Sequence, residues 1–184
     1  MREYVISKAK EIKEINEISM QDEIVIFGSS YMAKFPFYEL VNKCHFENAI
    51  YNRSIEGLTI SEAKEIFNDC VLGLNPSKLF ISLGEEDISN PKAIDDYRDL
   101  LNKAKKSLPD TCIYLIALEG NGEYQKNFNK KILNLCDNKK VKYIELSFEK
   151  TSLMLKMKKH FKQLSRFFRS KPIDFSDAFE LACI

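Results

Sequence analysis

The stretch from 23 to 30, Glu-Ile-Val-Ile-Phe-Gly-Ser-Ser, constrains the fold more than any other part of the sequence. Four apolar residues in a row, two of them isoleucine and one valine, are typical of a strand that is buried on both faces of a parallel sheet. Gly28 ends this run, and Ser29 and Ser30 precede a helix-forming segment. The pattern predicts a tight strand-to-helix turn at the carboxyl edge of a sheet, where open α/β folds bind ligands. Ser30 is therefore a candidate nucleophile.

The rest of the chain alternates predicted strands with predicted helices. This order predicts the α/β class, with a flavodoxin-like five-stranded parallel sheet inside a three-layer α/β/α sandwich. We expect a single domain over 1–184, with an N-terminal amphipathic helix within 1–20 packed outside the sheet. The predicted strands are 23–28, 48–52, 78–83, 112–118 and 141–146, and the predicted helices are 2–18, 31–43, 60–71, 89–107, 124–136, 149–168 and a short one from Ser176.

Three residues give local signals within these elements. Pro36 lies inside the helical pattern of 31–43, so we expect it near the start of that helix or at a kink. The hydroxyl of Thr59 is expected to cap the helix that follows it. Pro91 is expected in the first turn of the next helix, where a missing N–H does no harm.

Composition narrows the class of protein. No apolar run approaches the roughly 18 residues that cross a bilayer, and the charged start is unlike a signal peptide, so we expect a cytoplasmic protein. The five cysteines are scattered and form no C-x-x-C pair, which signals neither a disulfide framework nor a zinc site. The sequence signals no cofactor and no metal.

Charge is distributed unevenly along the chain. The segment 150–171 has eight Lys or Arg and no Asp or Glu, so it carries +8, whereas the remainder carries −7. Such asymmetry is typical either of a surface that binds nucleic acid or another polyanion, or of a solvated helix face. The apolar residues in the segment recur at helical spacing, which favours a core stripe over a base-stacking platform: Leu153, Met157, Phe161, Leu164 and Phe168.

The loops after the first three predicted strands carry further motifs. They contain Gly28-Ser29-Ser30, then Asn52-Arg53-Ser54-Ile55-Glu56-Gly57, then Gly84-Glu85-Glu86-Asp87. In order and spacing these blocks resemble those of the SGNH or GDSL hydrolases, which are serine esterases and acylhydrolases on a flavodoxin-like sheet. The resemblance covers 23–184 and implies that Ser30 is the nucleophile. It also implies that Gly57 gives a backbone N–H to the oxyanion hole, together with the N–H of Gly28 or Ser30.

The sequence departs from the family pattern at several positions. Ser29 stands where the first block has aspartate, and Glu86 stands where the third block has the asparagine that donates to the oxyanion. The segment 173–178 resembles the last block, Asp-x-x-His, but Asp174 falls on the histidine and Lys171 on the aspartate. The site residues that the resemblance implies are thus Ser30, Gly57, Glu86 and Asp174.

These departures change the expected chemistry. A serine nucleophile needs a base with a pKa near 7, and a carboxylate such as Asp174, with a reference pKa of ~3.9, is a weak substitute. An ionised Glu86 has no proton to donate, and losing one oxyanion donor costs roughly 2.7–4 kcal/mol. The two histidines, His45 and His160, lie outside any Asp-x-x-His context. As an alternative, Glu86 and Asp174 face each other across Ser30, so that one is protonated or the pair holds a cation.

Three functions remain open from the sequence. The first is a GDSL-type ester hydrolase that acts weakly on an unidentified acyl ester through Ser30. The second is a non-catalytic binding or scaffold module that keeps the same cleft for a small molecule. The third is a flavodoxin-like or nucleotide-binding domain in which Gly28-Ser29-Ser30 cradles a phosphate, although the turn lacks the usual glycine-rich patterns.

Overall fold

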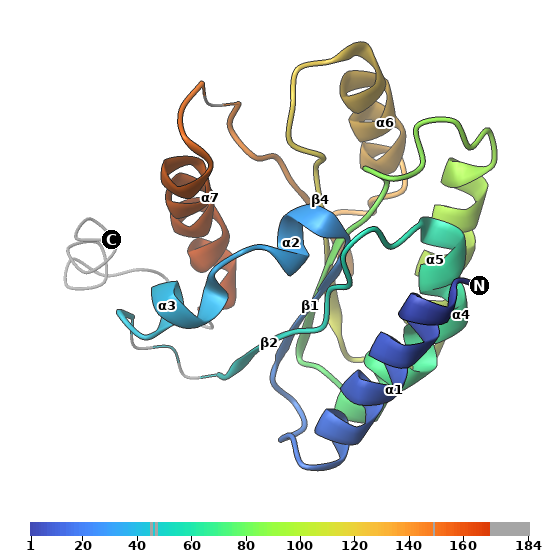
Figure 1. The fold of residues 1–184 in the computed structure, drawn as a ribbon, viewed down its shortest axis with the longest axis vertical. Coiled ribbons are helices and arrows are strands. Elements are labelled where there is room, and N and C mark those ends of the chain that lie inside the picture. Colours follow the sequence, from blue (N-terminus) through green and yellow to red (C-terminus); the bar gives the residue numbers. More distant parts are fainter. Residues whose placement is uncertain (45, 47, 149, 170–184) are drawn as a thin grey trace.

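The computed structural model describes residues 1–44, 46, 48–148 and 150–169. Five parallel strands form one sheet in the order β2-β1-β3-β4-β5 (Figure 1). The strand β1 lies inside the sheet and pairs with β2 on one side and with β3 on the other. The predicted sheet is therefore confirmed. Its strands are β1 (Ile24–Gly28), β2 (Ile50–Asn52), β3 (Lys78–Ser82), β4 (Cys112–Ile116) and β5 (Val141–Ile144).

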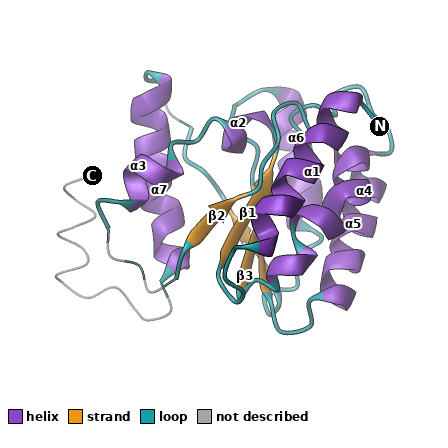
Figure 2. Ribbon diagram, turned by 60° about the horizontal axis from the view of Figure 1, so that its bottom comes forward, coloured by secondary structure: helices purple, strands orange, loops and turns teal. Residues whose placement is uncertain are grey.

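Helices cover both faces of this sheet, as Figure 2 shows. Side chains alternate across β1, so Val25 and Phe27 join one buried cluster while Ile24 and Ile26 join another. The three-layer sandwich is thus confirmed. The first face packs against α1 (Glu3–Glu17), α4 (Ile60–Cys70), α5 (Ala93–Ser107) and α6 (Glu123–Leu133), and the second against α2 (Ser30–Ala33), α3 (Phe37–Val41) and α7 (Leu153–Phe168).

Some predicted boundaries need correction. The single helix expected over 31–43 is two short helices, α2 and α3, because Pro36 has no N–H with which to continue the first. The helix expected from 89 begins at Ala93, so Pro91 precedes it instead of lying in its first turn. Here the N–H of Asn90 donates to the Asp87 carbonyl at 2.9 Å, which forms a turn before the helix.

The predicted cap at Thr59 is confirmed. The Thr59 hydroxyl accepts from the N–H of Glu62, and the Glu62 carboxylate accepts from the N–H of Thr59, so the cap is a full capping box.

Most of the predicted apolar stripe on α7 is buried against the sheet, but Leu153 is half exposed and the prediction is wrong there. The buried members are Met157, Phe161, Leu164 and Phe168.

The C-terminal end of α7 is held by the sheet. The ammonium group of Lys78, at the start of β3, donates to the carbonyls of Phe167, Phe168 and Arg169 at 2.8–3.1 Å. Cations at a helix C-terminus satisfy its unpaired carbonyls. The last turn of α7 therefore lies at the amino edge of the sheet, opposite to the edge at which β1 ends. Among the described helices, none has both the length and the apolar character that crossing a bilayer requires.

Candidate active site

Ser30 lies at the carboxyl edge of the sheet, directly after β1. The strand ends at Gly28, and a Cβ placed there would come within 2.7 Å of the Ser82 carbonyl oxygen on β3. Glycine therefore allows the end of β1 to pass close to β3, and the N–H of Ser29 then donates to the same carbonyl at 3.0 Å. Ser30 opens α2 and is partly exposed, as predicted for a strand-to-helix turn.

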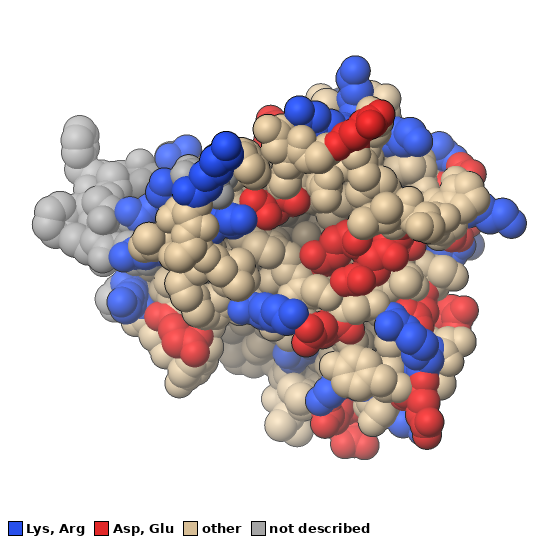
Figure 3. Space-filling view, turned by 45° about the horizontal axis from the view of Figure 1, so that its top comes forward, with Lys and Arg blue, Asp and Glu red and all other residues tan. Residues whose placement is uncertain are grey.

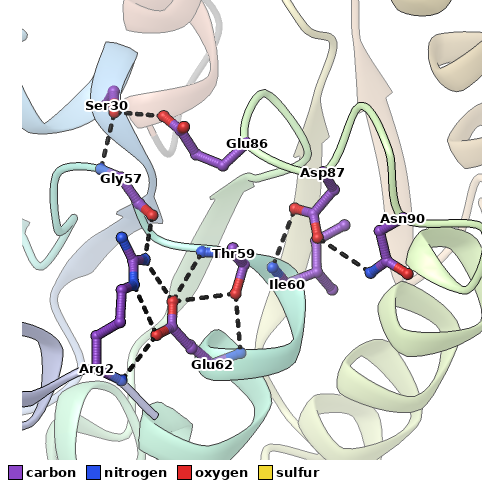
Figure 4. Close-up of polar contacts among 9 residues, drawn as sticks. All are labelled: Arg2, Ser30, Gly57, Thr59, Ile60, Glu62, Glu86, Asp87 and Asn90. Carbon is purple, nitrogen blue, oxygen red and sulfur yellow. Dashed lines mark hydrogen bonds and ion pairs between the residues drawn. The ribbon is translucent and has the colours of Figure 1, made fainter.

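Two groups from neighbouring loops contact the Ser30 hydroxyl (Figure 4). The backbone N–H of Gly57 donates to Ser30 Oγ at 2.8 Å. The hydroxyl in turn donates to Oε1 of Glu86 at 2.6 Å. The structure thus brings together three of the four residues that the sequence singled out.

The loop that carries Gly57 is fixed largely by backbone bonds to β1. The N–H of Arg53 donates to the Ile26 carbonyl at 2.8 Å, and that of Ile55 to the Gly28 carbonyl at 3.0 Å. The amide of Asn52 donates to the Met32 carbonyl at 2.8 Å and accepts from the N–H of Ser54. Asn52 therefore ties the loop to α2.

Arg2 reaches this loop from the start of α1. Its guanidinium donates to the Gly57 carbonyl and to both carboxylate oxygens of Glu62. Glu62 completes the capping box of Thr59. The sequence predicted the cap at Thr59 alone, and the contact between Arg2 and Glu62 was missed because the two residues lie 60 positions apart. No local pattern in the sequence signals such a contact.

The loop after β3 carries three consecutive acids with different surroundings. Gly84 has φ +117°, and its missing side chain leaves room for the ring of Phe128. Glu85 accepts the N–H of Tyr31 at 2.8 Å, and burial raises the pKa of its carboxyl. Asp87 is 3% exposed and accepts the N–H of Ile60 at 3.1 Å, and burial raises its pKa as well. Glu86 alone is exposed, and it faces Ser30.

The chain matches known proteins by structure but not by sequence. No family model matches the chain, and no curated protein matches it. A candidate platelet activating factor from Streptococcus pneumonia matches at TM-score 0.79 and 18% identity, over 90% of this chain and 92% of its own. A candidate acylhydrolase from Bacteroides fragilis matches at TM-score 0.70 and 12% identity, over 92% and 100%. A GDSL-like lipase from Bacteroides thetaiotaomicron matches at TM-score 0.66 and 11% identity, over 87% and 96%. The chain has an SGNH/GDSL hydrolase-like fold.

No described contact within this SGNH-like fold brings a histidine to Ser30. His160 on α7 is fully buried, and its Nε2 lies 2.8 Å from the Ser147 carbonyl, which accepts only. The ring therefore holds a hydrogen on Nε2, and its Nδ1 lies 2.6 Å from the Tyr31 hydroxyl oxygen. His45, Lys171 and Asp174 lie outside the described residues, so the role of Asp174 stays a prediction.

A groove opens beside Glu86. It has a volume of about 410 Å³. Figure 3, in which the top of Figure 1 comes forward, shows acidic side chains gathered near the middle of the surface with basic side chains around them. The described residues contain no cluster of three or more His, Cys, Asp or Glu that could hold a metal ion. The groove is lined by Thr59, Ser61, Glu85, Glu86, Asp87, Ile88, Ser89 and Asn90.

Proposed function

We propose that the protein is an SGNH-type ester hydrolase of low turnover, with Ser30 as the nucleophile. The observation that supports this most directly is the bond from the Gly57 N–H to Ser30 Oγ, at 2.8 Å. A backbone donor that already points at the nucleophile lies close to where the oxyanion of a tetrahedral intermediate forms. The partial exposure of Ser30 and the neighbouring groove leave space for a small acyl ester.

In this proposal Ser30 Oγ forms a bond to the acyl carbon, and the carbonyl oxygen becomes the oxyanion. The bond from the acyl carbon to the alcohol oxygen then breaks, and the alcohol leaves with the proton that the Ser30 hydroxyl gives up. Water adds to the acyl carbon of the serine ester, the acid leaves, and Ser30 Oγ takes back a proton from that water. The Gly57 N–H, which bonds Ser30 Oγ in the structure, transfers its hydrogen bond to the oxyanion and stabilises it. The companion donor of the family is the asparagine at the position of Glu86, and here the Glu86 carboxylate accepts from Ser30 instead.

Glu86 accounts for the expected low rate. Its charge lies next to the place where negative charge develops, and it offers no hydrogen to the oxyanion. As a proton acceptor for Ser30 a carboxylate is weaker than the imidazole that serine hydrolases use. Two losses in one site are therefore expected to leave residual hydrolysis only.

Hydrolysis of p-nitrophenyl acetate tests the proposal. The wild-type chain is expected to hydrolyse the ester above the buffer rate, and Ser30→Ala is expected to remove that increment. A matched control is Ser54→Ala, on the loop of Gly57 but without a described contact to Ser30. Equal rates for wild type and Ser30→Ala would contradict the proposal.

A second candidate function is a binding module on the same fold. It is supported by the specific contact at Glu86, which satisfies the Ser30 hydroxyl at 2.6 Å. In that case the groove holds a small molecule and Ser30 is only one of its polar contacts. Covalent labelling of Ser30 by a fluorophosphonate probe would count against this candidate, since a probe of that kind requires a reactive serine.

A further inference from the structure

The first residue before α1 reaches into the candidate active site. Arg2 Nη2 donates to the Gly57 carbonyl and to Glu62 Oε2, and Nε donates to Glu62 Oε1 at 2.9 Å. The backbone N–H of Arg2 donates to the same Oε1 at 3.1 Å. Figure 4 shows the side chain lying between the glycine and the glutamate. One guanidinium thus joins the start of the chain, the Gly57 loop and the start of α4.

Gly57 is the residue at which such a contact matters most. Its φ is +73°, a backbone conformation that glycine enters freely and leaves freely. On one side its N–H is bonded to Ser30 Oγ, and on the other its carbonyl is bonded to Arg2. The two peptide groups that flank this flexible residue are therefore each held by a side chain from a different part of the molecule.

Glu62 holds the guanidinium in place. Its side chain is 11% exposed, compared with 53% for Arg2, so the carboxylate is the rigid member of the pair. The Thr59 N–H and hydroxyl also donate to Glu62 Oε2, at 3.4 and 3.0 Å. The hydrogen bond from Arg2 is the main reason that the pKa of Glu62 is lowered to about 2, which keeps the carboxylate charged near neutral pH.

We propose that Arg2 is a positioning residue that fixes the Gly57 backbone so that its N–H points at Ser30. The fork of the guanidinium bonds one carbonyl and one carboxylate at once, which a lysine ammonium cannot match in geometry. The effect of Arg2 on the order of Gly57 stands on these contacts alone. Its effect on the reactivity of Ser30 rests on the proposed function.

The first readout does not depend on hydrolysis. Amide hydrogen exchange by nuclear magnetic resonance compares Gly57 with the core amide of Val25 in wild type, Arg2→Ala, Arg2→Lys and Lys8→Ala. Lys8 is the matched control, because it is a charged residue on α1 whose ion pair with Glu11 is remote from Gly57. We expect exchange at Gly57 to rise about tenfold in both Arg2 variants, with Val25 unchanged, since a net hydrogen bond corresponds to roughly that factor.

Three results of the exchange measurement would overturn the positioning role of Arg2. Unchanged Gly57 exchange in Arg2→Ala, or a wild-type value in Arg2→Lys, would show that the fork does not hold the glycine. A rise at Gly57 matched by an equal rise at Val25 would show general destabilisation and would also contradict the proposal.

The second readout measures kcat and KM for p-nitrophenyl acetate in the same variants. We expect kcat to fall about tenfold in Arg2→Ala while KM stays within about twofold, because the N–H acts on the transition state more than on the bound ester. Altered Gly57 exchange with an unchanged kcat would overturn the link to reactivity. Absence of any Ser30-dependent hydrolysis in wild type would instead refute the proposed function, and the exchange readout would still decide the role of Arg2.

Discussion

The two loops on either side of β1 differ in what they offer to Ser30. The loop after β2 ends at Gly57 and contributes a backbone N–H, held through its neighbouring carbonyl by Arg2. The loop after β3 contributes the carboxylate of Glu86, which is exposed. One side of the hydroxyl therefore meets a fixed donor and the other meets a negative charge. The first suits oxyanion chemistry, and the second opposes it.

In the loop after β3, one acid holds the fold and the next one contacts Ser30. Asp87, next to Glu86, is buried and holds the start of α4 through the N–H of Ile60. The loop after β3 is thus also tied to the fold, even though its exposed acid is unsuited to ester hydrolysis. Packing keeps the site assembled whether or not it turns over.

The largest expected effect comes from replacing the carboxylate in the loop after β3 by an amide. Glu86→Gln keeps the shape of the side chain, removes its charge and adds an amide donor. We expect kcat/KM for p-nitrophenyl acetate to rise on the order of a hundredfold, the size of one oxyanion donor. A fall in rate would show that Glu86 serves as the proton acceptor of Ser30 and that the contrast between the loops is wrong.

The next effect comes from disturbing the loop after β2. Gly57→Ala places a side chain at φ +73° and is expected to destabilise the protein by about 1–2 kcal/mol, with kcat about tenfold lower. Gly73→Ala is the matched control, because a Cβ at Gly73 has no neighbour within 4 Å. For both variants, urea unfolding measures the loss of stability and ester hydrolysis measures the fall in kcat. Equal behaviour of the two alanines would contradict the special role of Gly57.

Acid titration distinguishes two carboxyl groups near these loops. The pKa of Glu62, which is linked to the Gly57 loop through Arg2, is lowered, whereas the pKa of Asp87 in the loop after β3 is raised. The pKa of Glu62 is lowered to about 2, chiefly by the hydrogen bond from Arg2, so its stabilisation is present above the unfolded pKa near 4.5 and is lost as pH falls toward 2. Burial raises the pKa of Asp87, so its contribution is present at low pH and is lost as pH rises through the raised value.

Urea unfolding at pH 6, 4 and 3 checks these opposite signs. Glu62→Gln is expected to lose about 1–2 kcal/mol at pH 6, a value reduced because Arg2 is half exposed, and progressively less as the pH falls. The disadvantage of Asp87→Asn against wild type is expected to grow over the same interval. Parallel pH profiles for the two variants would remove this distinction between the loops.

The smallest effect is expected at the ion pair beside Gly57. Lys34 and Glu56 lie 2.5 Å apart, and both side chains are more than half exposed. Exposed pairs of this kind contribute little because solvent screens them. Lys34→Ala is therefore expected to unfold at the wild-type urea concentration, and a clear shift of the midpoint would show that this pair also holds the loop.

The sequence predicts those parts of the molecule that depend on neighbouring residues. The run of apolar residues at β1, the turn at Ser30 and the cap at Thr59 are all encoded within a few positions, and the structure agrees. Gly57 was singled out by the resemblance of its loop to the second block of the SGNH/GDSL hydrolases, and the structure brings it to Ser30. Pro36 was recognised as a local disturbance, but the two helices that it separates were predicted as one.

Other features depend on contacts between distant residues. Arg2 and Gly57 are 55 positions apart, and Tyr31 and His160 are 129 apart, so no periodicity in the sequence indicates either pair. The burial of Asp87 beside the exposed Glu86 is likewise set by the packing of α4 against the loop. The resemblance placed Glu86 at the Ser30 site, but nothing in the sequence indicated that Asp87 is buried and bonds the start of α4.

Labelling with a fluorophosphonate probe tests the central claim most directly, namely that Ser30 is a reactive serine in an assembled site. The account predicts one adduct by intact mass, located by peptide mapping on Ser30 and absent from Ser30→Ala. Labelling of Ser30→Ala to the same extent, or no adduct in wild type under conditions that label a known GDSL esterase, would contradict it.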